Sequence, residues 1–130
     1  MIVLDTHIWL WWITNEQKPL KKSWILAIEE TDRVGVSAIS CFEVAWLVRH
    51  QRISMAINMS DWFDMALGGS DISLLPLTPA IAEIATCLPE HHSDPQDRII
   101  IATAMEYDAQ LISADKKFKL YGEIVERLIN

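Results

Sequence analysis

Short apolar runs alternate with helical patterns along the whole chain, beginning at the second residue. Short, unbroken apolar runs are typical of parallel strands that are buried on both faces of a sheet. Because strands and helices alternate, we expect a single α/β domain, residues 1–130, whose parallel sheet is covered by helices on both faces. The predicted strands are residues 2–4, 34–37, 72–75 and 111–112, with a final strand expected at 124–128.

Between these strands, apolar residues recur with the spacing of helices that bury one side. Leu20, Trp24 and Ile28, for example, repeat every four residues on one helical face. Proline in the first turn and Ser, Thr or Asp at the N-cap mark several helix starts. The predicted helices are residues 8–13 after Thr6 as N-cap, 19–30 opened by Pro19, 40–48 started by Ser40, 60–67, 79–88 opened by Pro79, and 94–107 opened by Asp94 and Pro95.

Composition narrows the class of protein. The 130 residues are 51% hydrophobic and 22% charged, which fits one globular domain with its own core. No segment reaches the ~18 apolar residues of a membrane helix, so we expect no membrane partner. Cys41 and Cys87 stand in no disulfide-scaffold or zinc-site spacing, which indicates a reduced compartment and predicts a cytoplasmic protein. The net charge of −7 argues against a basic surface that clamps nucleic acid.

Acidic residues gather where the predicted strands end. The carboxyl ends of parallel strands meet at one edge of the sheet, where ligands bind. Two carboxylates about 5 Å apart repel by about 3 kcal/mol at an effective dielectric constant of about 20. A hard divalent cation would remove this cost, and oxygen ligands favour Mg²⁺ or Mn²⁺, which also bind substrate phosphate and can activate a water. The acids expected at this edge are Asp5, Glu43, Asp97 and Asp115, with Asp94 one turn before Asp97.

Most of these acids also have a purely structural interpretation. Ser40 and Glu43 match the capping box, in which Glu43 hydrogen-bonds the backbone of Ser40. Asp97 fits the first-turn acid of a capped helix, and Asp115 fits a turn residue. Asp5 directly follows a buried strand and is harder to explain in this way. One such acid indicates a cap, whereas four at one edge favour a site.

Two further features leave alternatives open. His91 and His92 are either metal ligands or acid–base groups, or they belong to an ordinary polar loop. The six tryptophans are many for this length, and the stretch 8–13 is apolar all round. These side chains therefore belong either to the core or to an interface with a second surface. The tryptophans assigned to a partner interface are Trp9, Trp11, Trp12 and Trp24.

Four segments, in this order and spacing, resemble the PIN-domain family and, more narrowly, the VapC-type toxins of bacterial toxin–antitoxin pairs. They are DTHIWLWW, SAISCFEVAWL, HHSDPQDRIIIATA and LISADKKF. The resemblance implies a three-layer α/β/α sandwich with a short parallel sheet and Mg²⁺- or Mn²⁺-dependent endoribonuclease activity. It implies metal binding and catalysis by Asp5, Glu43, Asp97 and Asp115, with Asp94 as a further candidate ligand and supporting roles for Thr6, Ser113 and His92.

The resemblance also implies an RNA substrate, a homodimer and a cognate antitoxin whose helical segment covers the apolar helices near the site. Two alternatives remain. A phosphate-accepting, receiver-like domain has similar layering, but Asp5 lacks the adjacent acid expected there, and His7 stands where a DxD phosphatase has its second acid. A non-catalytic PIN-like scaffold would only bind a partner, and the presence of all four acids counts against it.

Overall fold

Four short strands form one parallel sheet in the computed structural model, which describes residues 1–16, 19–91 and 93–130. Their order across the sheet is β3-β2-β1-β4, and every neighbouring pair is parallel. All four lie within one residue of their predicted positions. The strands are β1 (Ile2–Leu4), β2 (Val34–Ser37), β3 (Ile72–Leu75) and β4 (Gln110–Ile112).

The register of the strands brings their carboxyl ends to one edge of the sheet. Leu4 of β1 pairs with Val36 of β2 on one side and with Ile112 of β4 on the other. The backbone N–H of Asp5 then donates to the carbonyl of Ile112 at 3.0 Å, which extends this pairing by one residue. The chain therefore leaves β1, β2 and β4 at the same edge, as expected for a parallel sheet.

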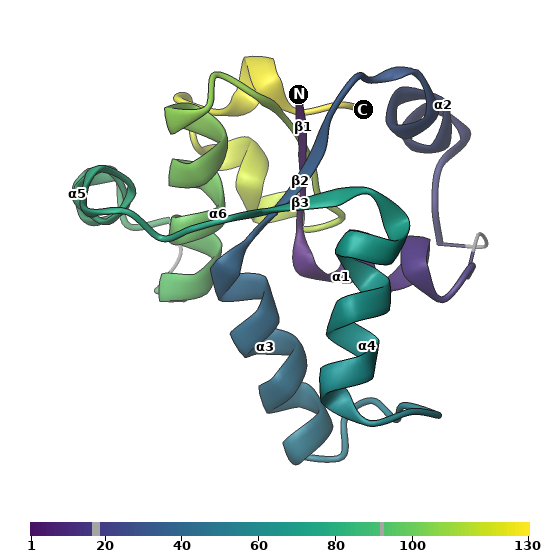
Figure 1. Ribbon diagram of the computed structural model, residues 1–130. Coiled ribbons are helices and arrows are strands. Elements are labelled where there is room, and N and C mark those ends of the chain that lie inside the picture. Colours follow the sequence, from purple (N-terminus) through teal and green to yellow (C-terminus); the bar gives the residue numbers. More distant parts are fainter. Residues whose placement is uncertain (17–18, 92) are drawn as a thin grey trace.

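Helices cover both faces of the sheet, so the predicted three-layer architecture is confirmed (Figure 1). On one face, Ile2 and Leu4 pack in a core cluster with α1, α2 and α4. On the other, Val3 packs with α6, and α5 packs in turn on α6. The helices are α1 (Thr6–Ile13), α2 (Lys22–Glu30), α3 (Ala38–Arg49), α4 (Met59–Ala66), α5 (Pro79–Cys87) and α6 (Pro95–Glu106), and the 3₁₀ turns are η1 (Gly68–Ser70), η2 (Lys116–Leu120) and η3 (Val125–Arg127).

Several helix starts differ from the predicted ones. Asp5, rather than Thr6, is the N-cap of α1. Ser37 caps α3, where its side-chain oxygen accepts from the backbone N–H of Ile39 at 3.2 Å, so this helix begins before Ser40. Proline does not open α2, which begins at Lys22. For α1 and α3, a neighbouring residue of similar capping ability competes for the position, and local sequence does not choose between them; α2 has Lys21 at its N-cap, with no side-chain cap hydrogen bond.

The predicted final strand at 124–128 is wrong. This segment forms the 3₁₀ turn η3 and makes one isolated bridge to β4, between Leu111 and Leu128. Arg127 instead donates to the Asp108 carboxylate at 2.6 Å, outside the sheet. In the part of the chain that the structure describes, no helix is both long enough and apolar enough to cross a membrane.

Candidate functional site

Asp5 lies at the centre of the sheet edge, fixed between β1 and β4. Its side chain is 8% exposed. One carboxylate oxygen accepts from the backbone N–H of Thr6 at 2.8 Å, and the other accepts from the Ser113 hydroxyl at 2.6 Å. Burial raises the pKa of Asp5, while these two hydrogen bonds oppose that shift. The Ser113 hydroxyl therefore orients the Asp5 carboxylate.

Glu43 reaches the same region from α3. The Thr6 hydroxyl lies 3.2 Å from Oε1 of Glu43 and 2.9 Å from Oγ of Ser40. Ser40 is fully buried. Burial, followed by the negative charge of Asp5, raises the pKa of Glu43 to about 7. Since Ser37 is the N-cap and Ser40 lies within α3, the capping-box interpretation is wrong. Ser40 was missed as a site residue because its serine-to-glutamate spacing fits a cap equally well.

Asp97 is affected by the charges of all the other acids expected at this edge. Burial raises the pKa of Asp97 to about 8, together with the negative charges of Asp5, Asp94, Glu43 and Asp115. Asp94 is the N-cap of α6, as predicted, and accepts from the backbone N–H of Gln96 at 2.9 Å. These shifts place five carboxyl groups in one electrostatic environment. We call Asp5, Glu43, Asp94, Asp97 and Asp115 the acidic rim.

Asp115 combines a structural role with membership of the acidic rim. Its backbone N–H donates to the Ser113 hydroxyl at 3.0 Å, and its carboxylate caps η2 by accepting from the backbone N–H of Lys117 at 2.9 Å. Its charge also raises the pKa of Asp5 and of Asp97. The turn interpretation and the site interpretation of Asp115 are therefore compatible.

The two histidines described around this part of the sequence, His7 and His91, have different surroundings. The charge of the exposed His7, which follows Thr6 in α1, partly offsets the rise that burial causes in the pKa of Asp5. His91 packs edge-on against the ring of Tyr121, with ring centroids 4.9 Å apart. The predicted supporting residue His92 lies outside the described residues.

The predicted partner-binding tryptophans divide into two pairs. Trp9 is 0% exposed and Trp24 is 4% exposed, so their assignment to a partner surface is wrong. Both indoles donate hydrogen bonds inside the fold, Trp9 to the carbonyl of Ala66 at 3.1 Å and Trp24 to that of Ile129 at 2.9 Å. Trp11 and Trp12, in contrast, are only partly buried. The sequence pattern could not separate Trp9 from Trp11 and Trp12, because the stretch 8–13 is apolar all round.

The raised pKa values predict an unusual dependence of stability on pH. Because folding raises the pKa of Glu43 and Asp97, the folded state binds more protons than the unfolded state between about pH 4 and pH 8. The contribution of these two carboxyl groups to the free energy of unfolding is therefore present near pH 4 and is lost as pH rises through about 7 and 8. We expect on the order of 1 kcal/mol for each carboxyl after allowing for solvent screening.

This dependence can be measured as the melting temperature of the chelator-treated protein. Between about pH 5.5 and pH 8.5, the melting temperature should fall by several degrees. The variant Asp97→Asn should show a weaker fall, because it removes one of the two titrating groups. A melting temperature that stays constant or rises over this interval would contradict the electrostatic description of the acidic rim.

Comparisons with known proteins agree with this architecture. The model of the PIN domain family matches residues 2–124. Ribonuclease VapC22 of Mycobacterium tuberculosis is 35% identical over 119 residues, which cover 91% of this chain and 89% of that protein. This match confirms the resemblance found in the sequence.

Solved structures share the fold at lower identity. VapBC2 from Rickettsia felis, bound to a DNA fragment from its promoter, has a chain that matches with a TM-score of 0.71 and 17% identity, covering 100% of this chain and 98% of that chain. DNA-bound VapBC from Salmonella typhimurium matches with a TM-score of 0.68 and 18% identity, covering 98% and 95% of the two chains. Sheet, helices and family match agree, and this chain belongs to the PIN-domain family.

Proposed function

We propose that this protein is the toxin of a toxin–antitoxin pair and cleaves RNA as a Mg²⁺- or Mn²⁺-dependent endoribonuclease. The observation that carries the proposal is the acidic rim, in which burial, together with the charges of four other acids, raises the pKa of Asp97 to about 8. A chain that holds such mutually repelling carboxyl groups at a sheet edge is suited to a divalent cation. The 35% identity to a ribonuclease adds the substrate class and argues against a receiver-like domain.

The donor chemistry of the rim fits the proposed ion. Asp5, Glu43, Asp97 and Asp115 would hold it, with Asp94 as a further ligand, and all of them supply oxygen atoms. In the described portion of the chain, no three His, Cys, Asp or Glu side chains already converge as a metal site. The carboxylates would therefore have to draw together when an ion binds. A bound divalent ion would neutralise the carboxylates, bind a phosphate oxygen and activate the attacking water.

Residues of this chain position the acids for that chemistry. Ser113 donates to one oxygen of Asp5, which fixes the orientation of this carboxylate. Thr6 contacts both Ser40 and Glu43, which ties the first turn of α1 to α3. Such supporting hydrogen bonds orient ligand side chains and limit their movement. We propose this positioning role for Thr6, Ser40 and Ser113.

Metal dependence is the direct test of the proposed activity. Purified, antitoxin-free protein should cleave total RNA in Mg²⁺ or Mn²⁺, should stop when excess chelator is added, and should resume when the metal is restored. The products are resolved by gel electrophoresis. Full cleavage in excess chelator would exclude the proposed metal site, and intact RNA under all conditions would favour the non-catalytic scaffold.

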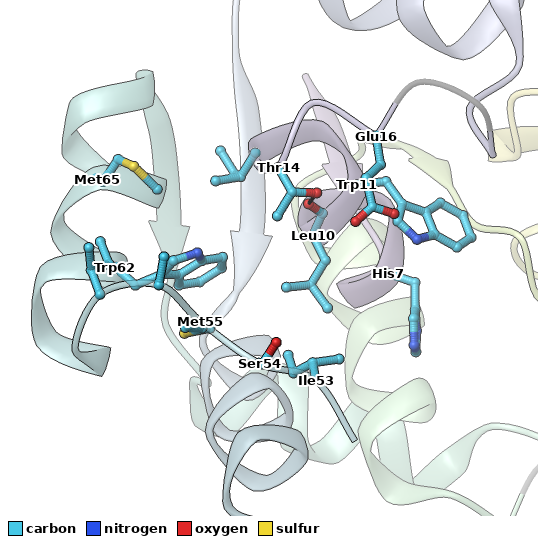
Figure 2. Close-up of a pocket in the computed structure, with 13 residues that line it drawn as sticks. His7, Leu10, Trp11, Thr14, Glu16, Ile53, Ser54, Met55, Trp62 and Met65 are labelled. Carbon is cyan, nitrogen blue, oxygen red and sulfur yellow. Dashed lines mark hydrogen bonds between the residues drawn. The ribbon is translucent and has the colours of Figure 1, made fainter. Parts of the chain in front are cut away.

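An apolar groove next to the acidic rim supports an antitoxin partner. It is a cavity of about 550 Å³ between α1, α4 and the segment that joins α3 to α4. Figure 2 shows Leu10 and Trp11 of α1 on one side, Met65 of α4 on the other, and Met55 between them. Apolar grooves of this kind accept the apolar face of a helix. We propose that a helical antitoxin segment occupies this groove, as the complexes named for the structural relatives suggest.

The corrected tryptophan assignment gives a prediction for this partner. When antitoxin binds, Trp11 should be protected from hydroxyl-radical labelling, because it lines the groove and is only partly buried. Trp9 is fully buried in the free protein and serves as the internal control. Mass spectrometry of labelled peptides, with and without antitoxin, measures both. Unchanged labelling of Trp11 would exclude this groove as the docking site.

We also propose that the protein forms a homodimer and acts in the cytoplasm. Phe42 and Trp46 support the dimer, because they lie one turn apart on α3 and are 55% and 43% exposed. Two large, exposed aromatic side chains on one helix face can be buried by contact with a second copy of the chain. Light scattering of the purified protein gives the oligomeric state, and a monomer at all concentrations would contradict this proposal.

A further inference from the structure

A second pocket adjoins the acidic rim and carries the opposite charge. It has a volume of about 230 Å³, and its described lining includes three lysine side chains. Lys21 directly precedes α2, whereas Lys116 and Lys119 belong to η2. The pocket also includes Ser113 and Asp115, which connect it to the rim. We call it the lysine pocket.

One of these lysines, Lys21, lies over the ring of the buried Trp24. Trp24 lines the pocket with a side chain that is 4% exposed and whose indole N–H donates to the carbonyl of Ile129. The ammonium nitrogen of Lys21 lies 5.0 Å from the centroid of the Trp24 ring. A lysine over an aromatic face gains cation–π stabilisation, so Lys21 is held near the pocket although it is exposed.

The concentration of positive charge in this pocket contrasts with the rest of the chain. The net charge is −7, yet three of the 11 lysines and arginines line this small pocket. The neighbouring acidic rim repels a polyanion, so RNA requires a compensating contact close to it. Lysine binds phosphate as a mobile point charge. A pocket of about 230 Å³ suits a phosphate group more than a helix or a large side chain.

We propose that the lysine pocket binds an RNA backbone phosphate adjacent to the phosphodiester that is cleaved. This inference rests on the proposed ribonuclease function. Asp115 is common to the pocket and the rim, so a strand with one phosphate in the pocket has its neighbouring phosphodiester near the acids. Lys21, Lys116 and Lys119 are then positioning residues, which bind and orient RNA without taking part in the chemistry.

The test compares two double variants that remove the same charge. Lys116→Gln with Lys119→Gln alters the pocket, whereas Lys22→Gln with Lys117→Gln alters the sequence neighbours that do not line it. Binding of a short, labelled oligouridylate is measured by fluorescence anisotropy in the Glu43→Gln background. The pocket variant should raise Kd about tenfold and reduce the dependence of log Kd on log salt by about 0.7 for each lost phosphate contact.

Two further results complete the test. The control variant should change Kd by about twofold or less. The double variant Lys116→Arg with Lys119→Arg should bind RNA about as tightly as the unmodified protein, because the positive charges are retained. In the wild-type background, the pocket variant should raise KM for RNA and leave kcat unchanged. Equal effects of the pocket and control variants, or a fall in kcat alone, would overturn the inference.

The failure of this inference can be distinguished from the failure of the proposed function. If the unmodified protein does not cleave RNA in any metal, the ribonuclease proposal fails, whatever the lysine variants show. If it cleaves RNA and the pocket variant binds and cleaves like the control variant, only the lysine pocket is excluded. The lysine pocket is likewise excluded if RNA binding by the pocket variant is weakened no more than RNA binding by the control variant.

Discussion

Replacing Glu43 with glutamine should reduce metal-dependent RNA cleavage by about 100-fold or more while the protein remains folded. Glutamine keeps the length of the side chain and can still accept a hydrogen bond from Thr6, whose hydroxyl lies 3.2 Å from Oε1. It cannot supply the negative charge that a divalent cation requires. The substitution therefore separates the charge of Glu43 from its contacts.

The second expected result for Glu43→Gln concerns the stability of the protein. Burial and the charge of Asp5 raise the pKa of Glu43 to about 7, so the ionised side chain is unfavourable in the metal-free protein above that pH. Glu43→Gln should leave the free energy of unfolding in chelator unchanged or raise it by on the order of 1 kcal/mol after solvent screening, so the melting temperature should not fall. Loss of cleavage with a lowered melting temperature would indicate a structural role instead.

A matched control uses a glutamate that does not belong to the acidic rim. Glu83 is exposed on α5, and Glu83→Gln makes the same chemical change. This variant should keep normal cleavage and a normal melting temperature. Asp5→Asn is a less direct test, because Asp5 accepts hydrogen bonds at both carboxylate oxygens and an amide can accept at only one. If Glu43→Gln cleaves RNA normally, the metal site must be rebuilt around the four remaining acids.

Replacing Trp9 with alanine should destabilise the fold by about 3–5 kcal/mol. Trp9 is 0% exposed and its ring centroid lies 5.1 Å from that of Trp62. Its indole N–H also donates to the carbonyl of Ala66, which accepts from the Ser70 hydroxyl as well, so the substitution leaves a cavity and removes one of two hydrogen bonds at that carbonyl. For a domain of this size, the melting temperature should fall by more than about 10 °C.

Trp11→Ala is the matched control for this prediction. It removes the same side chain two positions along α1, where the residue is only partly buried and lines the apolar groove. We expect a smaller loss of stability, below about 2 kcal/mol, together with weaker antitoxin binding. Thermal denaturation and titration with antitoxin measure the two effects. Similar losses of stability in both variants would contradict the separation of core from interface within α1.

The sequence alone was sufficient for the parallel sheet and for the edge at which the acids gather. Short apolar runs such as Ile2–Leu4 are buried on both faces, and this local pattern identifies them as strands. Because parallel strands end at one edge, the position of Asp5 after β1 and of Asp115 after β4 already placed both acids there. These inferences need only the order of residues along the chain.

The sequence did not separate capping from site chemistry, since both use the same residue types near helix starts. Ser40 has the spacing of a cap, but its hydroxyl contacts Thr6, which is 34 residues away. Asp94 and Asp115, in turn, are caps as well as members of the acidic rim. Only the packing of α1 against α3 shows which role a given hydroxyl has.

Tertiary contacts also determine which apolar residues are buried in the core and which charged residues lie close together. Trp9 and Trp11 share one short helix, and only the position of α4 makes one of them core. A Cβ at Gly35 would lie 2.7 Å from a side-chain carbon of the buried Leu75 on β3, so a larger residue there would force Leu75 to move. Lys21 joins Lys119 in one pocket because α2 packs near the end of the chain. Periodicity reports the environment of a residue relative to its own element, whereas these features depend on how separate elements pack together.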